Sequence, residues 1–245
     1  MPEKIKKGDF VEIEYTGAVK DSNTVFDTTN EELAKKEGLF NPKHRYGPVV
    51  VCVGERQLLP GLDKFLEGRE TGADYEVLIS PEDGFGKKDA KNMKLVPSKI
   101  FTKQKINPMP GLPVNIDGIY GVIITAAGGR TIVDFNHPLS GKELIYRCRA
   151  NKIIRESAEK LKSFLATELG IKDFNAEVKE GKAKVSLKAK LPEEISKLLE
   201  KKIMEIMPEI KSIIFEMSET AIKNLPNSVR GKKAVSEHDQ EPHNS

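Results

Sequence analysis

Alternating apolar and polar residues predict several strands in the first part of the chain. Apolar residues occupy every second position over 11–15, which predicts a half-buried strand that Gly17 ends. An apolar run predicts a second strand at 49–53, and further strands are predicted at 75–79 and 144–154. Leucine and phenylalanine residues recur at helical spacing between Pro60 and Gly68, and they predict one short helix there.

A segment with a different pattern interrupts these elements. Residues 88–131 contain short apolar pieces separated by prolines and glycines, and the pieces within 114–125 are typical of short strands. Gly128-Gly129 is typical of a turn, and polar residues flank the whole segment, as they often do at insertion sites. The pattern predicts a small inserted β domain at 88–131, within a first domain made of residues 1–87 and 132–153.

After Ile154 the apolar positions change to helical spacing. A helix with an apolar face is predicted from Ala158 to Leu165, with Gly170 as its C-terminal cap. Two alternating strands are predicted at 174–178 and 183–191, then a helix opened by Pro192 and a last strand at 213–217. The order α-β-β-α-β predicts a separate domain at 154–230. The polar residues 231–245 are expected to form a disordered tail.

Length and composition indicate a folded protein of more than one domain. At 245 residues, with 38% hydrophobic and 31% charged residues, the chain is long enough for two or three domains. Its net charge is +3 with both signs mixed, which favours a solvated surface over a nucleic-acid site. Cys52 and Cys148 lie in strand-like segments and are expected to be buried thiols. We find neither a membrane-length apolar run nor a signal-peptide core, so we expect a cytoplasmic protein.

Several short motifs follow one another at a characteristic spacing. They are YTG at 15–17, VFDTT at 25–29, VGERQLLPGLDKFLEG at 53–68, SPEDGFG at 80–86, DFNHPLSGKEL at 134–144 and IYRCRANKI at 145–153. In this order they resemble the FKBP family of peptidyl-prolyl cis-trans isomerases, in its SlyD-type branch with a chaperone domain inserted in the flap. The resemblance covers residues 1–153. It implies an α+β fold in which an antiparallel sheet wraps on one short helix, with the inserted β domain added. The C-terminal α-β-β-α-β domain predicted from the pattern lies beyond the resemblance.

The resemblance also implies the residues of an apolar binding pocket. They are Tyr15, Phe26, Asp27, Leu58, Leu59, Leu62, Phe85, Leu139 and Tyr146. Leu62 stands where eukaryotic members commonly place tryptophan, and the chain has no tryptophan, so a smaller pocket floor is expected. His137 is expected to be a turn residue in the loop facing the pocket, and residues 28–48 to form an extended bulge beside it. SlyD-type proteins often carry a metal-binding tail, but here the tail has only His238 and His243, so we expect neither metal nor cofactor.

Such a pocket would accelerate rotation about an X-Pro bond without a nucleophile. The C–N bond resists rotation by about 18–20 kcal/mol because it has partial double-bond character. That resonance is lost in the twisted transition state and charge separation falls, so an apolar pocket favours the twisted form over the planar amide. A 10⁴-fold acceleration would need the pocket to lower the activation free energy by only about 5–6 kcal/mol. The expected partners are unfolded polypeptides that contain X-Pro bonds.

The sequence also leaves other functions open. A non-catalytic holdase chaperone on the same scaffold is the main alternative. A hydrolase using Glu82 and Asp83 is disfavoured because adjacent residues on a strand-end loop point different ways and no histidine is near them in sequence. The insert is rich in apolar residues, of which we expect a subset to face the solvent and bind clients, the methionines among them. The C-terminal domain is expected to leave sheet edges unpaired, which favours a homodimer, with a second chaperone surface or a ribosome-binding module as the rival.

Overall fold

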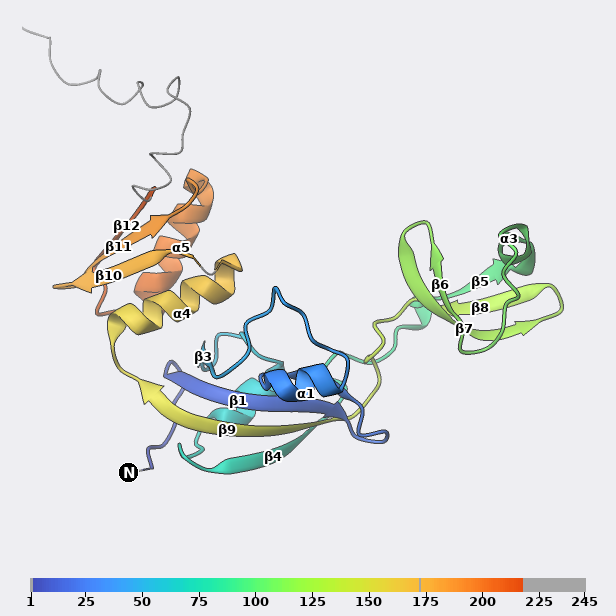
Figure 1. Cartoon of the computed structure of the whole chain (residues 1–245), viewed down its shortest axis with the longest axis horizontal. Coiled ribbons are helices and arrows are strands. Elements are labelled where there is room, and N and C mark those ends of the chain that lie inside the picture. Colours follow the sequence, from blue (N-terminus) through green and yellow to red (C-terminus); the bar gives the residue numbers. More distant parts are fainter. Residues whose placement is uncertain (1, 172, 218–245) are drawn as a thin grey trace, which may run out of the picture. The chain divides into compact units, whose positions relative to one another are not determined.

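The chain divides into two compact units. The computed structural model describes residues 2–171 and 173–217 (Figure 1). One unit comprises residues 1–153 and the other begins at Ile154. The predicted tail at 231–245, and residues 218–230 of the predicted C-terminal domain, lie outside the described residues. Mixed sheets with a few helices make this an α+β protein.

A five-stranded sheet forms the body of the first unit. Its neighbouring strands are β2 (Val25–Thr28), β1 (Phe10–Val19), β9 (Leu144–Ile154) and β4 (Asp74–Ile79), and β3 (Val49–Cys52) also pairs with β1. The short helix α2 (Pro60–Leu66) contacts β4 and buries Leu62 and Leu66. Leu66 packs with Ile5, Val11, Ile13, Val51, Val53 and Ala150 in one apolar core. The strands therefore bury one face against α2, and this positions the loops at the ends of the strands.

Strand β1 does not end at Gly17, as its sequence predicted, but continues to Val19. The register of β1 against β2 shifts between Gly17 and Ala18, which marks a β-bulge. A Cβ atom at Gly17 would lie 2.8 Å from Cζ of Tyr146 and 2.9 Å from Cζ of Phe26. The glycine is thus required by the close approach of two rings to the backbone and not by a turn.

A buried carboxylate shapes the turn before α2. Asp63 accepts hydrogen bonds from the backbone N–H groups of Gly54, at 2.9 Å, and Arg56, at 3.2 Å. Both of these residues have positive φ, 90° and 58°. Gln57 closes the same turn, because its Oε1 accepts the N–H of Cys52 at 2.8 Å. The turn fixes where the chain enters α2, and with it the positions of Leu58 and Leu59.

The insert has a four-stranded antiparallel sheet of its own, drawn in green in Figure 1. The strands lie in the order β5 (Met93–Pro97), β8 (Arg130–Asp134), β7 (Ile119–Ala127) and β6 (Pro113–Ile116), with η1 (Ala90–Asn92) before β5 and α3 (Ser98–Lys103) after it. Its core contains Val96, Phe101, Val114, Ile123 and Val133. Strands β5 and β8 were not predicted.

The insert's sheet extends past the predicted boundary at residue 131. Strand β8 pairs with β5 and β7, so residues 132–134 belong to this sheet and not to the larger one. Gly128 and Gly129 both have positive φ and join β7 to β8 as a two-residue hairpin. The predicted turn at these glycines needs a strand directly after it. The segment RTIVD is that strand, but it is too short for its pattern alone to predict one.

The second unit has the order of elements that its sequence predicts. These are α4 (Ser157–Leu169), β10 (Asn175–Lys179), β11 (Lys182–Leu187), α5 (Glu193–Ile206) and β12 (Ser212–Met217). Gly170 caps α4 in the left-handed conformation, with φ of 62°. Strands β10 and β11 form an antiparallel hairpin, whereas β11 and β12 are parallel and α5 connects them. Among the described helices, none is long and apolar enough to span a membrane.

Candidate active site

The structure brings all of the predicted apolar site residues into one cluster. Leu62 and Tyr146 are buried, and the half-buried members packed around them are Tyr15, Phe26, Leu58, Leu59, Phe85 and Leu139. These side chains come from β1, β2, the turn before α2, α2 itself, the loop after β4, the loop before β9, and β9. Residues more than a hundred positions apart in the sequence therefore form one apolar surface that is partly open to solvent.

Aromatic rings in defined orientations form the centre of this cluster. Phe26 meets Phe85 edge to face, with ring centroids 5.8 Å apart and planes at 81°. It meets Tyr146 in the same manner, at 5.8 Å and 77°. Tyr15 lies 5.8 Å from Tyr146 at a tilt of 51°. Edge-to-face pairs are favourable beyond the area that they bury, so the rings hold one another in place.

Asp27 is the polar group of the site. Its half-buried carboxylate accepts hydrogen bonds from the Tyr15 hydroxyl and from the Thr28 N–H. Burial raises the pKa of Asp27, while the Tyr15 hydrogen bond, the charge of His44 and the Thr28 N–H each oppose that rise. Burial, with the nearby charge of Asp27, also raises the pKa values of Tyr15 and Tyr146. Both phenols therefore stay protonated and can donate hydrogen bonds.

Backbone pairing fixes Tyr15 beside Asp27. The Tyr15 N–H donates to Oγ1 of Thr29 at 3.0 Å, and the Thr29 N–H donates to the Tyr15 carbonyl at 3.0 Å. The hydroxyls of Thr16 and Thr28 are also hydrogen-bonded, at 2.8 Å. The threonines of VFDTT thus tie β2 to β1 at the level of the site, which gives the motif a structural as well as a chemical part.

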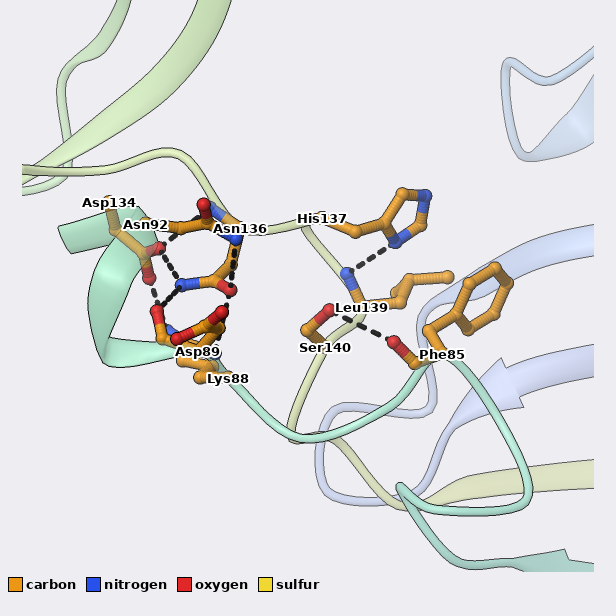
Figure 2. A network of polar contacts seen from close by, with 9 residues as sticks. All are labelled: Phe85, Lys88, Asp89, Asn92, Asp134, Asn136, His137, Leu139 and Ser140. Carbon is orange, nitrogen blue, oxygen red and sulfur yellow. Dashed lines mark hydrogen bonds and ion pairs between the residues drawn. The ribbon is translucent and has the colours of Figure 1, made fainter.

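Phe85 is held by the loop that precedes β9 (Figure 2). The Ser140 hydroxyl donates to the Phe85 carbonyl at 3.0 Å, and the Gly141 N–H donates to the Gly86 carbonyl at 2.8 Å. The imidazole of His137 stacks on the Phe85 ring, with centroids 4.6 Å apart and planes at 5°. Phe85 is therefore anchored through its backbone and through its ring.

The contacts of His137 and Ser140 were only partly foreseen. His137 is a turn residue, as expected, since its carbonyl accepts the Ser140 N–H at 2.9 Å and its Nδ1 accepts the Leu139 N–H at 3.2 Å. No pattern in the sequence predicts that His137 stacks on Phe85 or that Ser140 donates to the Phe85 carbonyl. These contacts join two loops that lie about fifty residues apart in the sequence. The only sequence feature that links the two loops is that each contains one of the FKBP-like motifs.

Glu82 and Asp83, the two acids near Phe85, form ion pairs that hold the loop. Glu82 pairs with Lys87 at 2.6 Å, and Asp83 pairs with Lys64 at 2.7 Å. The hydrogen bond from Lys87 lowers the pKa of Glu82. The Asp83 carbonyl also accepts the N–H of Gly61, at 2.8 Å, which attaches the loop to α2. These contacts give the acids a structural role on the surface.

Comparison with known proteins agrees with this arrangement. The profile of the family described as FKBP-type peptidyl-prolyl cis-trans isomerase matches residues 1–102, and that described as FKBP26, IF domain, matches residues 94–139. The short-type peptidyl-prolyl cis-trans isomerase of Methanocaldococcus jannaschii is 33% identical over 149 residues, which is 61% of this chain and 94% of that relative. The chain belongs to the FKBP-type peptidyl-prolyl cis-trans isomerases.

Bacterial members of the FKBP family are similar over a shorter stretch. SlyD of Haemophilus influenzae is 35% identical over 102 residues, and the match spans 40% of this chain and 53% of that relative. A probable FKBP-type 16 kDa isomerase of Pseudomonas fluorescens is 32% identical over 104 residues, 40% of this chain and 68% of that relative. The FKBP resemblance predicted from the motifs is thus confirmed, together with the presence of the insert.

The raised pKa of Asp27 predicts how this residue affects stability. The folded protein binds a proton at Asp27 at higher pH than the unfolded chain does, so stability rises as the pH falls through the folded pKa. The ionised carboxylate therefore costs stability at neutral pH. We expect Asp27→Asn to raise the Tm at neutral pH, and the difference from wild type to vanish below the ordinary pKa of aspartate.

Thermal unfolding of both proteins at the two pH values measures this difference. Asp74→Asn is the control, since Asp74 is exposed and its surface pair with Arg149, at 2.9 Å, should contribute little. A lower Tm for Asp27→Asn at neutral pH would show that the hydrogen bonds of the carboxylate outweigh its burial.

Proposed function

We propose that the cluster around Asp27 is the isomerase site of a cytoplasmic folding helper. The observation that carries this proposal is the meeting of the half-buried aromatic and leucine side chains with one hydrogen-bonded carboxylate. An apolar surface with few polar groups is the environment in which a twisted X-Pro amide is favoured over a planar one. The arrangement supplies that environment without a nucleophile or a metal.

In this proposal each part of the site has a separate task. Phe26, Phe85 and Tyr146 contact the proline ring and exclude water from the amide. Asp27 orients the Tyr15 hydroxyl and the substrate by hydrogen bonds, while Leu62 forms the floor. Because the Tyr146 phenol stays protonated, it can donate to a substrate carbonyl across the neutral pH range, whereas the single O–H of Tyr15 is held by Asp27. Rotation then follows from differential binding of the transition state.

A protease-free isomerisation assay on proline peptides tests the site. We expect Phe85→Ala and Asp27→Ala each to lower kcat/KM about tenfold or more, which is about 1.4 kcal/mol or more of transition-state stabilisation. Leu78→Ala is a matched control, because Leu78 is a leucine on β4 that is 51% exposed. Glu82→Gln is a second control, and it should also retain activity.

The outcomes separate the alternatives. Undiminished activity in both Phe85→Ala and Asp27→Ala would refute the site. A wild-type protein without turnover that still prevents aggregation would favour the holdase. Loss of activity in Glu82→Gln alone would revive a role for the acids of the loop.

We propose further that the insert binds unfolded chains through one face of its sheet. Directly opposed residues of antiparallel strands share a face, and Met93 and Val122 both oppose Asp134. Leu95 and Tyr120 lie two positions away on the same strands and so point the same way. Exposed fractions on this outer face are 40% for Met93, 59% for Leu95, 77% for Tyr120 and 38% for Val122. The opposite face holds the insert's buried core.

The exposed residues match the expected chemistry of a client site. Of the apolar residues predicted for the insert, Val96 and Phe101 are buried, while Met93, Leu95, Ile100 and Met109 are exposed. So large an apolar fraction on a small sheet is unusual for a surface with no partner. Flexible methionines suit clients of varied sequence.

The base of the insert connects this face to the isomerase site (Figure 2). Lys88 pairs with the buried carboxylate of Asp134 at 2.8 Å, and Asn136 donates to Asp134 at 2.7 Å and to the Asp89 carbonyl at 3.0 Å. Burial acts to raise the pKa of Asp134, but the hydrogen bonds from Lys88 and Asn136 outweigh it and lower the pKa. These contacts therefore join the two segments that link the insert to the larger sheet, close to Phe85 and Leu139. This supports delivery of clients from the insert to the site.

Refolding of a proline-limited protein tests the client face. We expect Leu95→Ser to lower the ratio of refolding catalysis to short-peptide turnover several-fold, because it removes exposed apolar area from the outer face. Leu78→Ser is the control, since Leu78 is also an exposed strand leucine. An unchanged ratio in Leu95→Ser, and in Tyr120→Ser tested beside it, would contradict the delivery role.

For the second unit we propose self-association. In the described residues β10 and β12 stand at the two edges of a three-stranded sheet, and sheet edges attract partner strands. Exposed apolar residues also lie on α5 and β12, namely Ile195 at 41%, Leu198 at 65% and Ile214 at 64%. A symmetric pairing of two copies would cover these groups.

Light scattering on the full chain and on a chain ending near Ile154 measures this association. We expect the full chain to be a dimer and the shortened chain a monomer that keeps short-peptide turnover, because the site lies within residues 1–153. Leu198→Lys in the full chain should weaken the dimer. The same oligomeric state for the full and shortened chains would instead favour a second chaperone surface or a ribosome-binding module.

A further inference from the structure

A second group of rings lies outside the site cluster, in the connection between β2 and β3. Phe40 stacks on Tyr46, with centroids 5.5 Å apart and planes at 16°. His44 meets Tyr46 at 5.1 Å and 67°. Phe40 is 41% exposed and the neighbouring Leu39 is 37% exposed. We call Leu39, Phe40, His44 and Tyr46 the outer ring cluster.

The outer ring cluster is rigidly supported. Helix α1 (Glu31–Lys36) begins at Asn30, whose Oδ1 accepts the Leu33 N–H at 2.9 Å, and the Leu39 N–H closes its far end on the Ala34 carbonyl at 2.8 Å. The Tyr46 hydroxyl accepts the Asn41 N–H at 3.0 Å. The Lys35 ammonium lies 4.9 Å from the centre of the Phe40 ring. Exposed apolar side chains that are fixed in this way lose little conformational entropy when they bind.

The cluster also borders the isomerase site. The Gly47 N–H donates to the Thr29 carbonyl at 2.7 Å, and Thr29 pairs in turn with the backbone of Tyr15. Helix α1 contacts β2, the strand that carries Phe26 and Asp27. The charge of His44 acts on the Asp27 carboxylate. Two contacts of flanking residues and the charge of His44 thus place the connection that carries the outer ring cluster beside β2 and Asp27.

We propose that the outer ring cluster is a substrate subsite for one aromatic or large aliphatic side chain, a few residues from the proline. The inference rests on the proposed function, because the occupant is the polypeptide whose X-Pro bond lies at Asp27. An extended chain advances about 3.3 Å per residue, so a substrate longer than a dipeptide must leave the site across a neighbouring surface. The exposed edge of Phe40 and the Leu39 side chain offer such a surface. The basic neighbour Lys35 is paired with Glu31 at 2.6 Å, which favours an apolar occupant over an acidic one.

A peptide series measures the preference directly. One peptide carries a single proline among alanines, and the others carry one phenylalanine at successive positions on either side. The measured quantity is the ratio of kcat/KM for the best phenylalanine peptide to that for the alanine peptide. We expect about three- to tenfold in wild type, the range of one aromatic contact, and a ratio near one in Phe40→Ala. Phe40→Tyr keeps the ring and should restore the preference.

The control is Leu78→Ala, which removes an exposed leucine elsewhere and should keep the wild-type ratio. A wild-type ratio near one at every position would overturn the subsite, and so would an unchanged ratio in Phe40→Ala. Failure of the proposed function is distinguishable from both, because wild type would then accelerate neither peptide. A Phe40→Ala loss that Phe40→Tyr does not restore would also count against the subsite, since it would reflect altered loop structure.

Discussion

The hydrogen bond from the Tyr15 hydroxyl to the Asp27 carboxylate reconciles two opposed requirements. Catalysis by an apolar environment needs water excluded from the amide, whereas substrate orientation needs a polar group at the same place. Burial of a carboxylate is costly, and here the Tyr15 hydroxyl and the Thr28 N–H offset part of that cost. The backbone pairing of Tyr15 with Thr29 keeps these donors in place. The aromatic rings of the site therefore pack around the Asp27 carboxylate while its hydrogen bonds hold it in place.

The site is assembled from side chains on several loops. Two of these loops also lead into and out of the insert. The segment that carries Phe85 continues into the insert, and the segment that carries Leu139 returns from it. Ser140 and His137 join the two at the site, while Asp134 and Asn136 join them at the base of the insert. The connection after β2 carries the outer ring cluster. The site is thus bordered by the two surfaces for which we propose contact with polypeptide.

The sequence predicted which apolar side chains cluster around Leu62 and Tyr146, because they lie in motifs with fixed spacing. Strand β9 was predicted with its observed bounds, since buried residues alternate with the exposed Arg147 and Arg149 along it. Gly17 was misread, because a glycine that admits two rings looks the same in sequence as one that ends a strand. Strand β8 was missed because five residues carry too little pattern by themselves. The stacking of His137 on Phe85 depends on tertiary approach, which periodicity does not encode.

The discontinuous first domain has a consequence for biosynthesis. Strand β9 supplies Leu144 and Tyr146 and pairs with β4, which precedes the entire insert in the chain. Strands β6, β7 and β8 of the insert pair over short sequence distances, and β5 precedes them, so the insert's sheet can form while the chain is still being made. The larger sheet must wait until β9 has left the ribosome. Under the proposed function, a nascent chain would therefore present the client face of the insert before β9 completes the isomerase site.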